Sequence, residues 1–529
     1  MTSERHPHSV VAHVPTELLL AIGQFLNGPS LAHCLQVCRQ WHCTLQPLVW
    51  STISEYQWHS KSFPIQLNIN TSKDLALSPR LPLIRQITWE DNNLVSLKWK
   101  GSRAVSRQFT GARLAWLLQR TLNLASLSLR RSCDGFAPVF YRALADLPNL
   151  RRLHIHIPLH KARIPIEDMF PLFSRLHELY LAGCWYNHEK STEPLLPNEK
   201  TTPWRLKSLR CTRLDLALTR YCPDLTFFEM YTFDHRSGIP PVSLRFLLDC
   251  PKLETVKLPN YTRKNDLVDM AETFRSLKAL RSLYFNVNLR EQLVFLYAPD
   301  FLLNKPQQLI DTYSLSHPST PVPDQELMSA PLLEHLHVNH ITAGVDREDS
   351  FRILCNILKT RVNLKSFRVS EPINPTHIFA QPGQEARDSW GCKSLVSLFL
   401  SLPMSIYSKT EVERTAFWYP IYRQIGQLSK LQSLTILCDS VQKDKGSGIQ
   451  QLVGSTGLKR LVLCGSADSE WTREEIMDLL SALPKLKELQ LKPLRKGNFL
   501  QIKSWLCEAG RSDIIFGKQW GRESSDFLA

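Results

Sequence analysis

One short pattern, Leu-x-x-Leu-x-Leu with apolar substitutes, recurs along most of this 529-residue chain. Its last two apolar positions are separated by one variable residue, which is the period of a β-strand with one buried face. Most intervals between successive motifs are 26–31 residues. A recurring period of this length predicts stacked repeats, each of which buries its apolar face against its neighbours. The motifs begin at Leu94, Leu124, Leu150, Leu176, Leu206, Leu225, Leu253, Leu280, Leu333, Leu364, Leu395, Leu431, Leu458 and Leu486.

Helical patterns occupy much of the sequence between the motifs. They lie at residues 112–120, 139–146, 244–249, 267–277, 351–359 and 474–483. Proline stands two residues before several motifs, at Pro148, Pro223, Pro251 and Pro484. Because proline cannot continue a helix and favours an extended predecessor, it suits the junction between a helix and a strand. Each repeat is therefore predicted to contain one strand and one helix.

This repeat resembles the leucine-rich repeat, whose period is roughly 20–29 residues. The resemblance implies an α/β fold, a right-handed solenoid with parallel strands on its concave face and helices on its convex face. Cys184 stands three residues after Leu181, where the longer, cysteine-containing type of repeat places a residue that satisfies the backbone of the turn. Most other repeats lack Asn or Cys at this position.

Two places depart from the period. The 53 residues from Leu280 to Leu333 are close to two intervals, which predicts a degenerate repeat between Phe285 and Leu333 and about 14–15 repeats in all. A further candidate strand, Ile84-x-x-Ile87-x-Trp89, begins only ten residues before Leu94. That spacing is too short for a repeat, so this candidate receives no assignment.

The N-terminal segment has a different character, with three short helices predicted between residues 14 and 53. Pro15 suits the first position of a helix, and apolar residues then follow at helical spacing, at Leu18, Leu19, Ile22, Phe25 and Leu26. The stretch Asn27-Gly28-Pro29 is predicted to end this helix, residues 31–45 to form the second and residues 48–53 the third. A unit of about forty residues is marginal as a free-standing domain, so its surplus apolar faces imply a partner.

The order of residues in this unit resembles the F-box. Val14-Pro15-Thr16-Glu17-Leu18-Leu19 is followed by Ile22, Phe25-Leu26, Leu31, Val37-Cys38-Arg39-Gln40-Trp41 and Leu48-Val49-Trp50. The family pattern is Leu-Pro-x-Glu-Leu, an apolar pair, Val-Cys-x-x-Trp and a closing Leu-Trp; Val14 replaces the usual Leu, and residues 27–30 vary the turn. The resemblance implies docking onto the Skp-type adaptor of a cullin ubiquitin ligase, through Pro15, Leu18, Leu19, Ile22, Leu35 and Trp50. The alternative is that these side chains pack against the repeats that follow.

The predicted organisation has five parts. They are a disordered N-terminus at residues 1–12, the F-box at 13–55, a linker or start of the solenoid at 56–93, irregular leucine-rich repeats at 94–510 and a tail at 511–529. Segments 183–204, 287–331, 371–390 and 402–419 are longer than repeat connections need. Long loops on a rigid scaffold often carry recognition, so these are candidate binding loops.

Strand alternation predicts which residues face a partner. The residue between the last two apolar positions, and the one after the motif, should point to the concave face. These positions are rich in Tyr, Arg and His, a composition enriched at protein interfaces. The candidate substrate-binding residues are Arg130, His154, His156, Tyr180, Arg210, Tyr231, Lys257, Tyr284, His337 and Arg368. The strip then becomes apolar at Phe399, Leu437, Val462 and Cys464, which predicts that residues 514–516, another loop or a partner cover it.

Composition narrows the class of protein. With 43% hydrophobic and 21% charged residues, the chain is typical of globular proteins. A secretory signal and an apolar stretch of membrane-spanning length are both lacking, so the cytosol and/or nucleus is expected. The thirteen cysteines form no Cys-x-x-Cys pair, which favours buried thiols over disulfides or zinc ligands. The net charge of +15 is dispersed, which disfavours a dedicated nucleic-acid site.

Catalytic signatures are missing from the sequence. It contains no GxxxxGK loop, GxSxG elbow or HExxH motif, and no cofactor or metal ion is expected. The leading hypothesis is a non-catalytic receptor: the F-box docks on a Skp-type adaptor, and through it a cullin, while the repeats hold a protein substrate for ubiquitination. The alternatives are an F-box scaffold acting outside a cullin ligase and an RNA-associated repeat protein.

Overall fold

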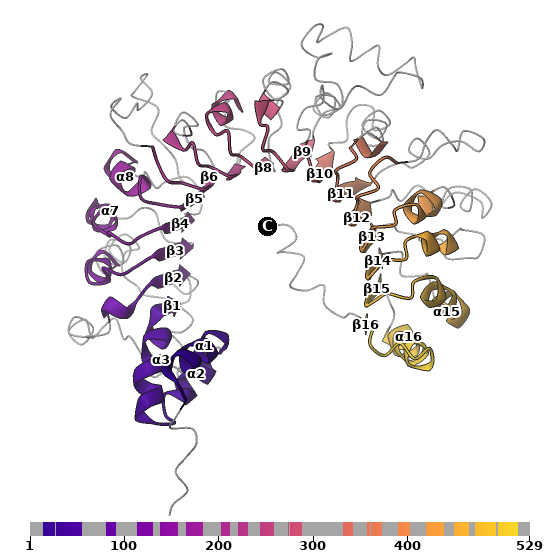
Figure 1. The fold of residues 1–529 in the computed structure, drawn as a ribbon, viewed down its shortest axis with the longest axis horizontal. Helices are drawn as coiled ribbons and strands as arrows, with labels where there is room; N and C mark the ends of the chain where they lie inside the picture. The colour runs from indigo at the N-terminus through magenta and orange to yellow at the C-terminus, as the bar shows by residue number, and fades with distance from the viewer. Residues whose placement is uncertain are drawn as a thin grey trace, which may run out of the picture. The chain divides into compact units, whose positions relative to one another are not determined.

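The computed structural model describes the regular parts of the chain (Figure 1). These are residues 14–26, 28–54, 81–90, 114–130, 138–156, 166–182, 203–211, 219, 221–230, 244–258, 273–274, 276–287, 332–341, 357–359, 361–372, 390–401, 419, 421–437, 449–464, 471–492 and 496–516. The chain divides into two compact units, Met1–Phe233 and Asp234–Ala529.

Three helices open the first unit: α1 (Thr16–Phe25), α2 (Gly28–Cys34) and α3 (Arg39–Ser51). Their shared core consists of the buried residues Leu19, Leu31, Leu45 and Val49. Gly23 allows α1 to approach α3 closely, because a Cβ there would lie 2.6 Å from a methyl carbon of Leu48. The predicted number of helices is therefore confirmed.

Their boundaries differ from the prediction. The predicted second helix, residues 31–45, is divided: α2 ends at Cys34, and a turn follows in which the Val37 N–H donates to the Cys34 carbonyl (3.2 Å). Trp41 and Leu45 consequently belong to α3. Gly28 and Pro29, predicted to lie in a break, instead begin α2, because the first turn of a helix tolerates a residue without an N–H.

The third helix leads directly into the sheet. Strand β1 (Thr52–Ser54) follows α3 and pairs in parallel with β2 (Gln86–Glu90). The Arg85 N–H donates to the Ser51 carbonyl (2.9 Å), and Leu83, in the 3-10 helix η2 (Leu81–Leu83), packs against the helical core. The segment around Ile87 that received no assignment is thus a strand of the sheet. The motif predicted at Leu94 lies outside the described residues.

The remaining strands of the first unit follow in sequence order, each parallel to the one before. They are β3 (Ser126–Arg130), β4 (Arg152–His156), β5 (Glu178–Ala182), β6 (Ser208–Cys211) and β7 (Phe227–Met230). Helices α7 (Pro138–Ala145) and α8 (Ile166–Phe173) connect successive strands and lie together on one side of the sheet (Figure 1). The prediction of one strand and one helix in each repeat is confirmed for these two connections.

The second unit repeats this arrangement. Its strands are β8 (Thr255–Leu258), β9 (Ser282–Val287), β10 (His335–Ile341), β11 (Ser366–Pro372), β12 (Ser397–Ser401), β13 (Ser433–Leu437), β14 (Arg460–Cys464), β15 (Glu488–Lys492) and β16 (Ile515–Phe516). Within this unit, successive strands pair in parallel. Helices α15 (Arg473–Ala482) and α16 (Lys496–Glu508) follow β14 and β15, whereas η4 (Leu244–Asp249), predicted as an α-helical segment, and η9 (Ile449–Gly454) are 3-10 helices.

Two predictions for this unit are wrong. The degenerate repeat expected between Phe285 and Leu333 does not add a strand to the sheet, because β9 pairs directly with β10 and Leu283 is in register with Leu336. Strands β9 and β10 are therefore consecutive in the sheet. Residues 514–516 do not cover the sheet face either, since Ile515 and Phe516 form β16 and pair with Glu488 and Leu489 of β15.

Leucines fill the space between strands and helices. The motif residues Leu124, Leu127 and Leu129 have no exposed surface, and the equivalent residues of the other repeats are similarly buried. A tight turn precedes many of the strands: the N–H of Leu253, for example, donates to the Cys250 carbonyl (3.1 Å). Pro251 is the second residue of this turn, where proline is favoured. The prolines predicted at such junctions therefore occupy turns.

Successive repeats are also joined by shared carbonyls. The carbonyl of Ala125 accepts from the N–H groups of Arg151 (2.9 Å) and Arg152 (3.0 Å), both in the following repeat. Lys365 does the same for Val396 (2.7 Å) and Ser397 (3.0 Å). These bonds fix where each strand begins relative to the preceding strand. Insertions of different length between the strands therefore leave the register unchanged.

On the helix side, glycines allow backbones of neighbouring repeats to meet. A Cβ on Gly426 would collide with the Gln451 carbonyl oxygen of η9, and a Cβ on Gly454 would collide with the Gly426 carbonyl oxygen. Ser455, fully buried beside them, donates from its hydroxyl to the Ile425 carbonyl (2.9 Å). This contact therefore depends on glycine at two positions of consecutive repeats.

Candidate interaction surfaces

The first helix carries a row of exposed apolar side chains. Leu18, Ile22 and Phe25 are 56%, 46% and 89% exposed. Their spacing of four and three residues places them on one face of α1, while Leu19 and Gly23 form the opposite, buried face. Large exposed apolar patches mark interaction sites. We call Leu18, Ile22 and Phe25, with the neighbouring exposed Pro15, the α1 surface.

The six predicted adaptor-contact residues differ in their exposure to solvent. Pro15, Leu18 and Ile22 are exposed, and Leu35 is half-buried against the helical core. The prediction that Leu19 contacts the adaptor is wrong, because its side chain is fully buried in the core that α1 shares with α2 and α3. The side chain of Trp50 lies outside the described part of the chain.

Phe25 was assigned to the same apolar face as Leu19 and was not among the predicted contacts. The 18–22–25 spacing, read separately from 19–23–26, is the signal in the sequence that distinguishes the two faces of α1.

In the first unit, the residues between the last two apolar positions of each motif stand in register across the strands. They are Thr88, Ser128, His154, Tyr180, Arg210 and Glu229, and we call them the first ladder. His154 and Tyr180 contact edge to face with their ring centroids 5.8 Å apart. The Nε of Arg210 lies 3.5 Å from the Glu229 carboxylate, whose side chain is 3% exposed. The candidates His154, Tyr180 and Arg210 are thus brought together. Glu229, which was not among the predicted candidates, joins them through its ion pair with Arg210.

The second unit has an equivalent ladder, formed by Lys257, Tyr284, His337, Arg368, Phe399, Thr435, Val462 and Gln490. We call it the second ladder. The Nζ of Lys257 lies 5.0 Å from the centre of the Tyr284 ring. Tyr284 and His337 meet edge to face at 4.3 Å. The Arg368 guanidinium lies 4.5 Å from the centre of the Phe399 ring. Four predicted candidates therefore line up on adjacent strands, held by cation–π and aromatic contacts.

The second ladder has a positive electrostatic character. Burial, together with the nearby Arg368, His335 and Lys257, lowers the pKa of His337 to about 3. His337 is therefore neutral at pH 7, and its Nε2 lies 3.3 Å from the Ser366 hydroxyl. Burial also raises the pKa of Tyr284 and lowers that of Arg368. Lys257 and Arg368 consequently supply the positive charge of this ladder.

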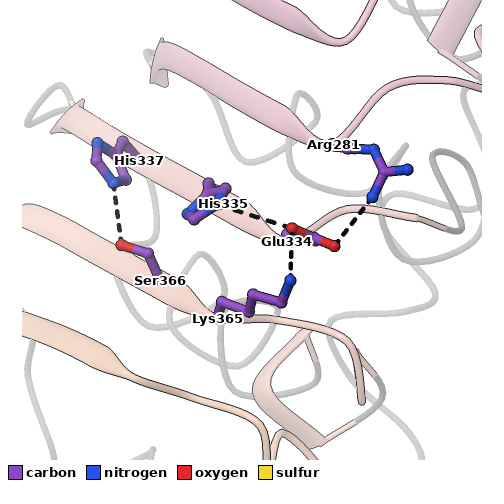
Figure 2. A network of polar contacts seen from close by, with 6 residues as sticks. All are labelled: Arg281, Glu334, His335, His337, Lys365 and Ser366. Atoms are coloured by element: carbon purple, nitrogen blue, oxygen red, sulfur yellow. Dashed lines mark hydrogen bonds and ion pairs between the residues drawn. The ribbon is translucent and has the colours of Figure 1, made fainter. Parts of the chain in front are cut away.

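A charged cluster lies next to this ladder, where the strands begin. Figure 2 shows Glu334 between Arg281 and Lys365, one from each flanking repeat. The Glu334 carboxylate accepts from Lys365 Nζ (2.9 Å) and Arg281 Nη1 (3.2 Å), with His335 Nε2 at 3.9 Å. The hydrogen bond from Lys365 is the main cause that lowers the pKa of Glu334. This cluster joins three consecutive repeats through side chains.

The late part of the second ladder differs from the predicted apolar strip. Phe399 and Val462 are in register with Thr435 and Gln490, so polar and apolar residues alternate. Leu437 and Cys464 lie two residues after Thr435 and Val462 in their strands and are half-buried. The predicted apolar strip is therefore only partly correct: Phe399 and Val462 are apolar ladder residues, but the ladder residues beside them are the polar Thr435 and Gln490.

Some predicted features fall outside the described residues. The side chains of Arg130 and His156 do so, as do Tyr231, Cys184 and most of the long loops. Of the described cysteines, Cys211, Cys222, Cys250 and Cys392 are buried, whereas Cys43 and Cys507 are exposed. Among the described residues no helix has the length and apolarity to cross a membrane, and no group of three or more His, Cys, Asp or Glu side chains could hold a metal ion.

Comparisons with known proteins give a family match at the N-terminal helices and several similar solved structures. Residues 11–55 match the family model described as F-box-like. A solved leucine-rich-repeat protein of Leptospira interrogans is similar at 15% identity and a TM-score of 0.35, over 76% of this chain and 91% of that one. The mouse RP105/MD-1 complex is similar at 13% identity and a TM-score of 0.38, over 77% of this chain and 61% of that chain. No curated protein sequence matches.

The chain thus combines an F-box-like domain at its N-terminus with leucine-rich repeats. Both are modules of protein interaction, as the sequence predicted. The α1 surface belongs to the first module, and the two ladders belong to the second.

Proposed function

We propose that this protein is the substrate-recognition subunit of a Skp–cullin–F-box ubiquitin ligase, acting in the cytosol and/or nucleus. The F-box-like domain would dock on the Skp-type adaptor, and through it on the cullin, and the repeats would hold a protein substrate. The protein would contribute positioning, which raises the effective concentration of substrate lysines near the transferring enzyme, and no bond chemistry.

The observation that carries the proposal is the α1 surface. Leu18, Ile22 and Phe25 stay largely exposed although the domain has a complete core of its own. Leaving three large apolar side chains in water forgoes about 1.5–3 kcal/mol of burial for each. Occupation by a partner recovers that free energy. The alternative that these residues pack against the repeats does not account for their exposure.

The test is co-purification of the full-length protein with a Skp-type adaptor and a cullin. The variant Leu18→Asp/Ile22→Asp places two charges in the proposed interface and should abolish adaptor recovery. Leu122→Asp is the matched control, because Leu122 is 55% exposed in the same unit but lies in a turn before β3. It should leave recovery unchanged. Both variants should match the wild-type circular dichroism spectrum and unfolding temperature.

The results separate the alternatives. Equal adaptor recovery by the wild type and by Leu18→Asp/Ile22→Asp would refute docking through α1. Recovery of the adaptor without a cullin would instead favour a scaffold that uses its F-box outside a cullin ligase.

A further inference from the structure

Both units have a row of residues that stands immediately before the strands. In successive repeats the N–H of this residue donates to the carbonyl of the equivalent residue in the preceding repeat, as from His177 to Arg151 (2.7 Å) and from Lys207 to His177 (2.8 Å). Consecutive members therefore lie side by side where the strands begin, and we call them the pre-strand row. In the first unit the row consists of Arg85, Ala125, Arg151, His177, Lys207 and Thr226, and in the second unit it begins with Glu254, Arg281, Glu334 and Lys365.

In the second unit, acidic and basic residues alternate along the start of this row. The Glu334 carboxylate is 2.9 Å from the Lys365 Nζ on one side and 3.2 Å from the Arg281 Nη1 on the other (Figure 2). One carboxylate in the row therefore contacts cations from both neighbouring repeats. The charges of these repeats are neutralised within the protein.

The pre-strand row of the first unit contains no carboxylate. Its members are basic or neutral, and two further arginines stand beside it in the sequence, one directly after Arg151 and one two residues before Lys207. We call the five Arg and Lys residues of this region the basic edge. They are Arg85, Arg151, Arg152, Arg205 and Lys207.

The charges of the basic edge are only partly compensated. Arg151 donates from Nη1 to two carbonyls of its own turn (both 3.2 Å), which are neutral acceptors. The other four residues are exposed, and in the described part of the chain none of them forms an ion pair. Two carboxylates lie near them in the sequence: Glu178, which is 3.8 Å from the Nε2 of His154, and Asp224 in the turn before β7. The cations of this region therefore outnumber its carboxylates.

The second unit indicates which anion suits this position. There the pre-strand row accommodates a carboxylate, Glu334, between cations of both neighbouring repeats. Proteins that bind single-stranded nucleic acid also present aromatic rings on which the bases stack. Next to the basic edge, Trp204 is buried, and the half-buried Phe227 has the Arg210 guanidinium 4.9 Å from the centre of its ring. Because neither ring is freely exposed for stacking, an acidic protein segment fits this edge better than a nucleic acid.

We propose that the basic edge of the first unit binds a protein segment rich in Asp and Glu. Carboxylates of this segment would contact cations of neighbouring repeats, as Glu334 does in the second unit. Arginine suits this role because its planar guanidinium presents several N–H donors to a carboxylate. The inference goes beyond the proposed function, because binding at the basic edge requires neither the adaptor nor a cullin.

The test measures the binding of fluorescent peptides to the full-length protein. One peptide alternates Glu with Ser, and a second has Gln in place of each Glu. The Glu peptide should bind about tenfold more tightly than the Gln peptide, because only the Glu peptide carries the complementary charge. Its affinity should fall as salt is raised to physiological concentration, where charges are screened over about 8 Å. A single-stranded RNA with the same number of charges, and vesicles containing an anionic phospholipid, are the competing ligands.

A charge reversal connects the binding to the basic edge. Arg205→Glu/Lys207→Glu changes two exposed residues that flank the buried Leu206. It should weaken binding of the Glu peptide about tenfold, because attractive contacts become repulsive. Arg205→Lys/Lys207→Arg keeps both charges and should bind like the wild type. The circular dichroism spectra of both variants should match that of the wild type.

The matched control is Lys485→Glu/Lys487→Glu in the second unit. These two exposed lysines flank the buried Leu486 as Arg205 and Lys207 flank Leu206. At the start of the neighbouring strand, Arg460 is already paired with Glu488, with its Nε 3.1 Å from the carboxylate. The control reverses the same amount of charge at the same positions of a repeat, and it should bind the Glu peptide like the wild type.

Several outcomes would overturn the inference. They are equal binding of the Glu and Gln peptides, tighter binding of the RNA or of the vesicles than of the Glu peptide, and an equal loss of affinity in the two charge-reversal variants. Leu18→Asp/Ile22→Asp leaves the basic edge unchanged and should bind the Glu peptide like the wild type. If the protein binds the peptide but no adaptor, the proposed function fails while the assignment of the basic edge stands.

Discussion

Replacing Gly426 by alanine should loosen the contact between two consecutive repeats. In the helix at residues 421–426, alanine is intrinsically better than glycine by about 1 kcal/mol. Here its Cβ would overlap the Gln451 carbonyl oxygen, so the backbone of η9 must shift. Overpacking typically costs about 1–3 kcal/mol. The cost here should be near the upper end of that range, because a backbone carbonyl, unlike a side chain, cannot rotate away from the added Cβ. The net destabilisation should be about 1–2 kcal/mol.

Gly457→Ala is the matched control. Its added Cβ would lie 3.4 Å from the carbonyl oxygens of Leu431 and Ser429, an ordinary contact between the same two repeats. The change in stability should stay within about 0.5 kcal/mol. The two variants therefore differ in close packing, while both remove a glycine from the same interface.

Hydrogen exchange measured by mass spectrometry is the appropriate assay, because repeat proteins open locally and a single unfolding free energy is poorly defined for them. In Gly426→Ala, peptides covering β13, β14 and η9 should exchange about tenfold faster for each 1.4 kcal/mol lost. Peptides covering α1 to α3 should exchange as in the wild type. Equal exchange in the Gly426→Ala and Gly457→Ala variants would refute the packing argument.

Two further predictions concern local stability. Thr472 and Glu475 form a reciprocal cap at the start of α15: the Glu475 N–H donates to Thr472 Oγ1 (3.2 Å) and the Thr472 N–H donates to Glu475 Oε2 (2.8 Å). Thr472→Ala should therefore destabilise the helix by about 1 kcal/mol and speed hydrogen exchange in the first turn of α15, and unchanged exchange there would contradict this prediction. The folded pKa of His337, about 3, lies below its ordinary value of 6.5, so the unfolded state binds the extra proton and stability should fall as the pH drops from about 6.5 toward about 3. His337→Gln should show a shallower decline in urea midpoint over that range, and identical slopes for both proteins would contradict the low pKa.

The repeat motif predicted the strands well because it states a burial requirement. In Leu-x-x-Leu-x-Leu, the last two leucines must both point between the layers, and this fixes the strand and also its neighbours in the ladder. Lys257, Tyr284, His337 and Arg368 could therefore be placed on one face from sequence alone. The distances between them, the neutral state of His337 and the charged cluster around Glu334 depend on packing, which the motif does not encode.

The predictions that were wrong also failed because they depend on strand pairing and packing. The period suggested a strand between Phe285 and Leu333, but sequence spacing cannot distinguish a degenerate repeat from an insertion once the register is set by shared carbonyls. It also gave no assignment to Ile87, whose strand is defined by pairing with β1. In α1, Leu18 and Leu19 are both apolar helical positions, and only the packing of α3 decides that Leu19 is buried.

The hydrogen bond between Ser51 and Arg85 gives the F-box-like domain a second role. Through this bond, through the pairing of β1 with β2 and through Leu83, the domain terminates the first unit's sheet at its N-terminal side. A truncated protein lacking residues 1–55 would expose the unpaired backbone of β2, and exposed strand edges promote aggregation. Loss of substrate binding after such a deletion would therefore not separate ligase recruitment from folding. Point substitutions on α1, which leave this cap in place, make that separation.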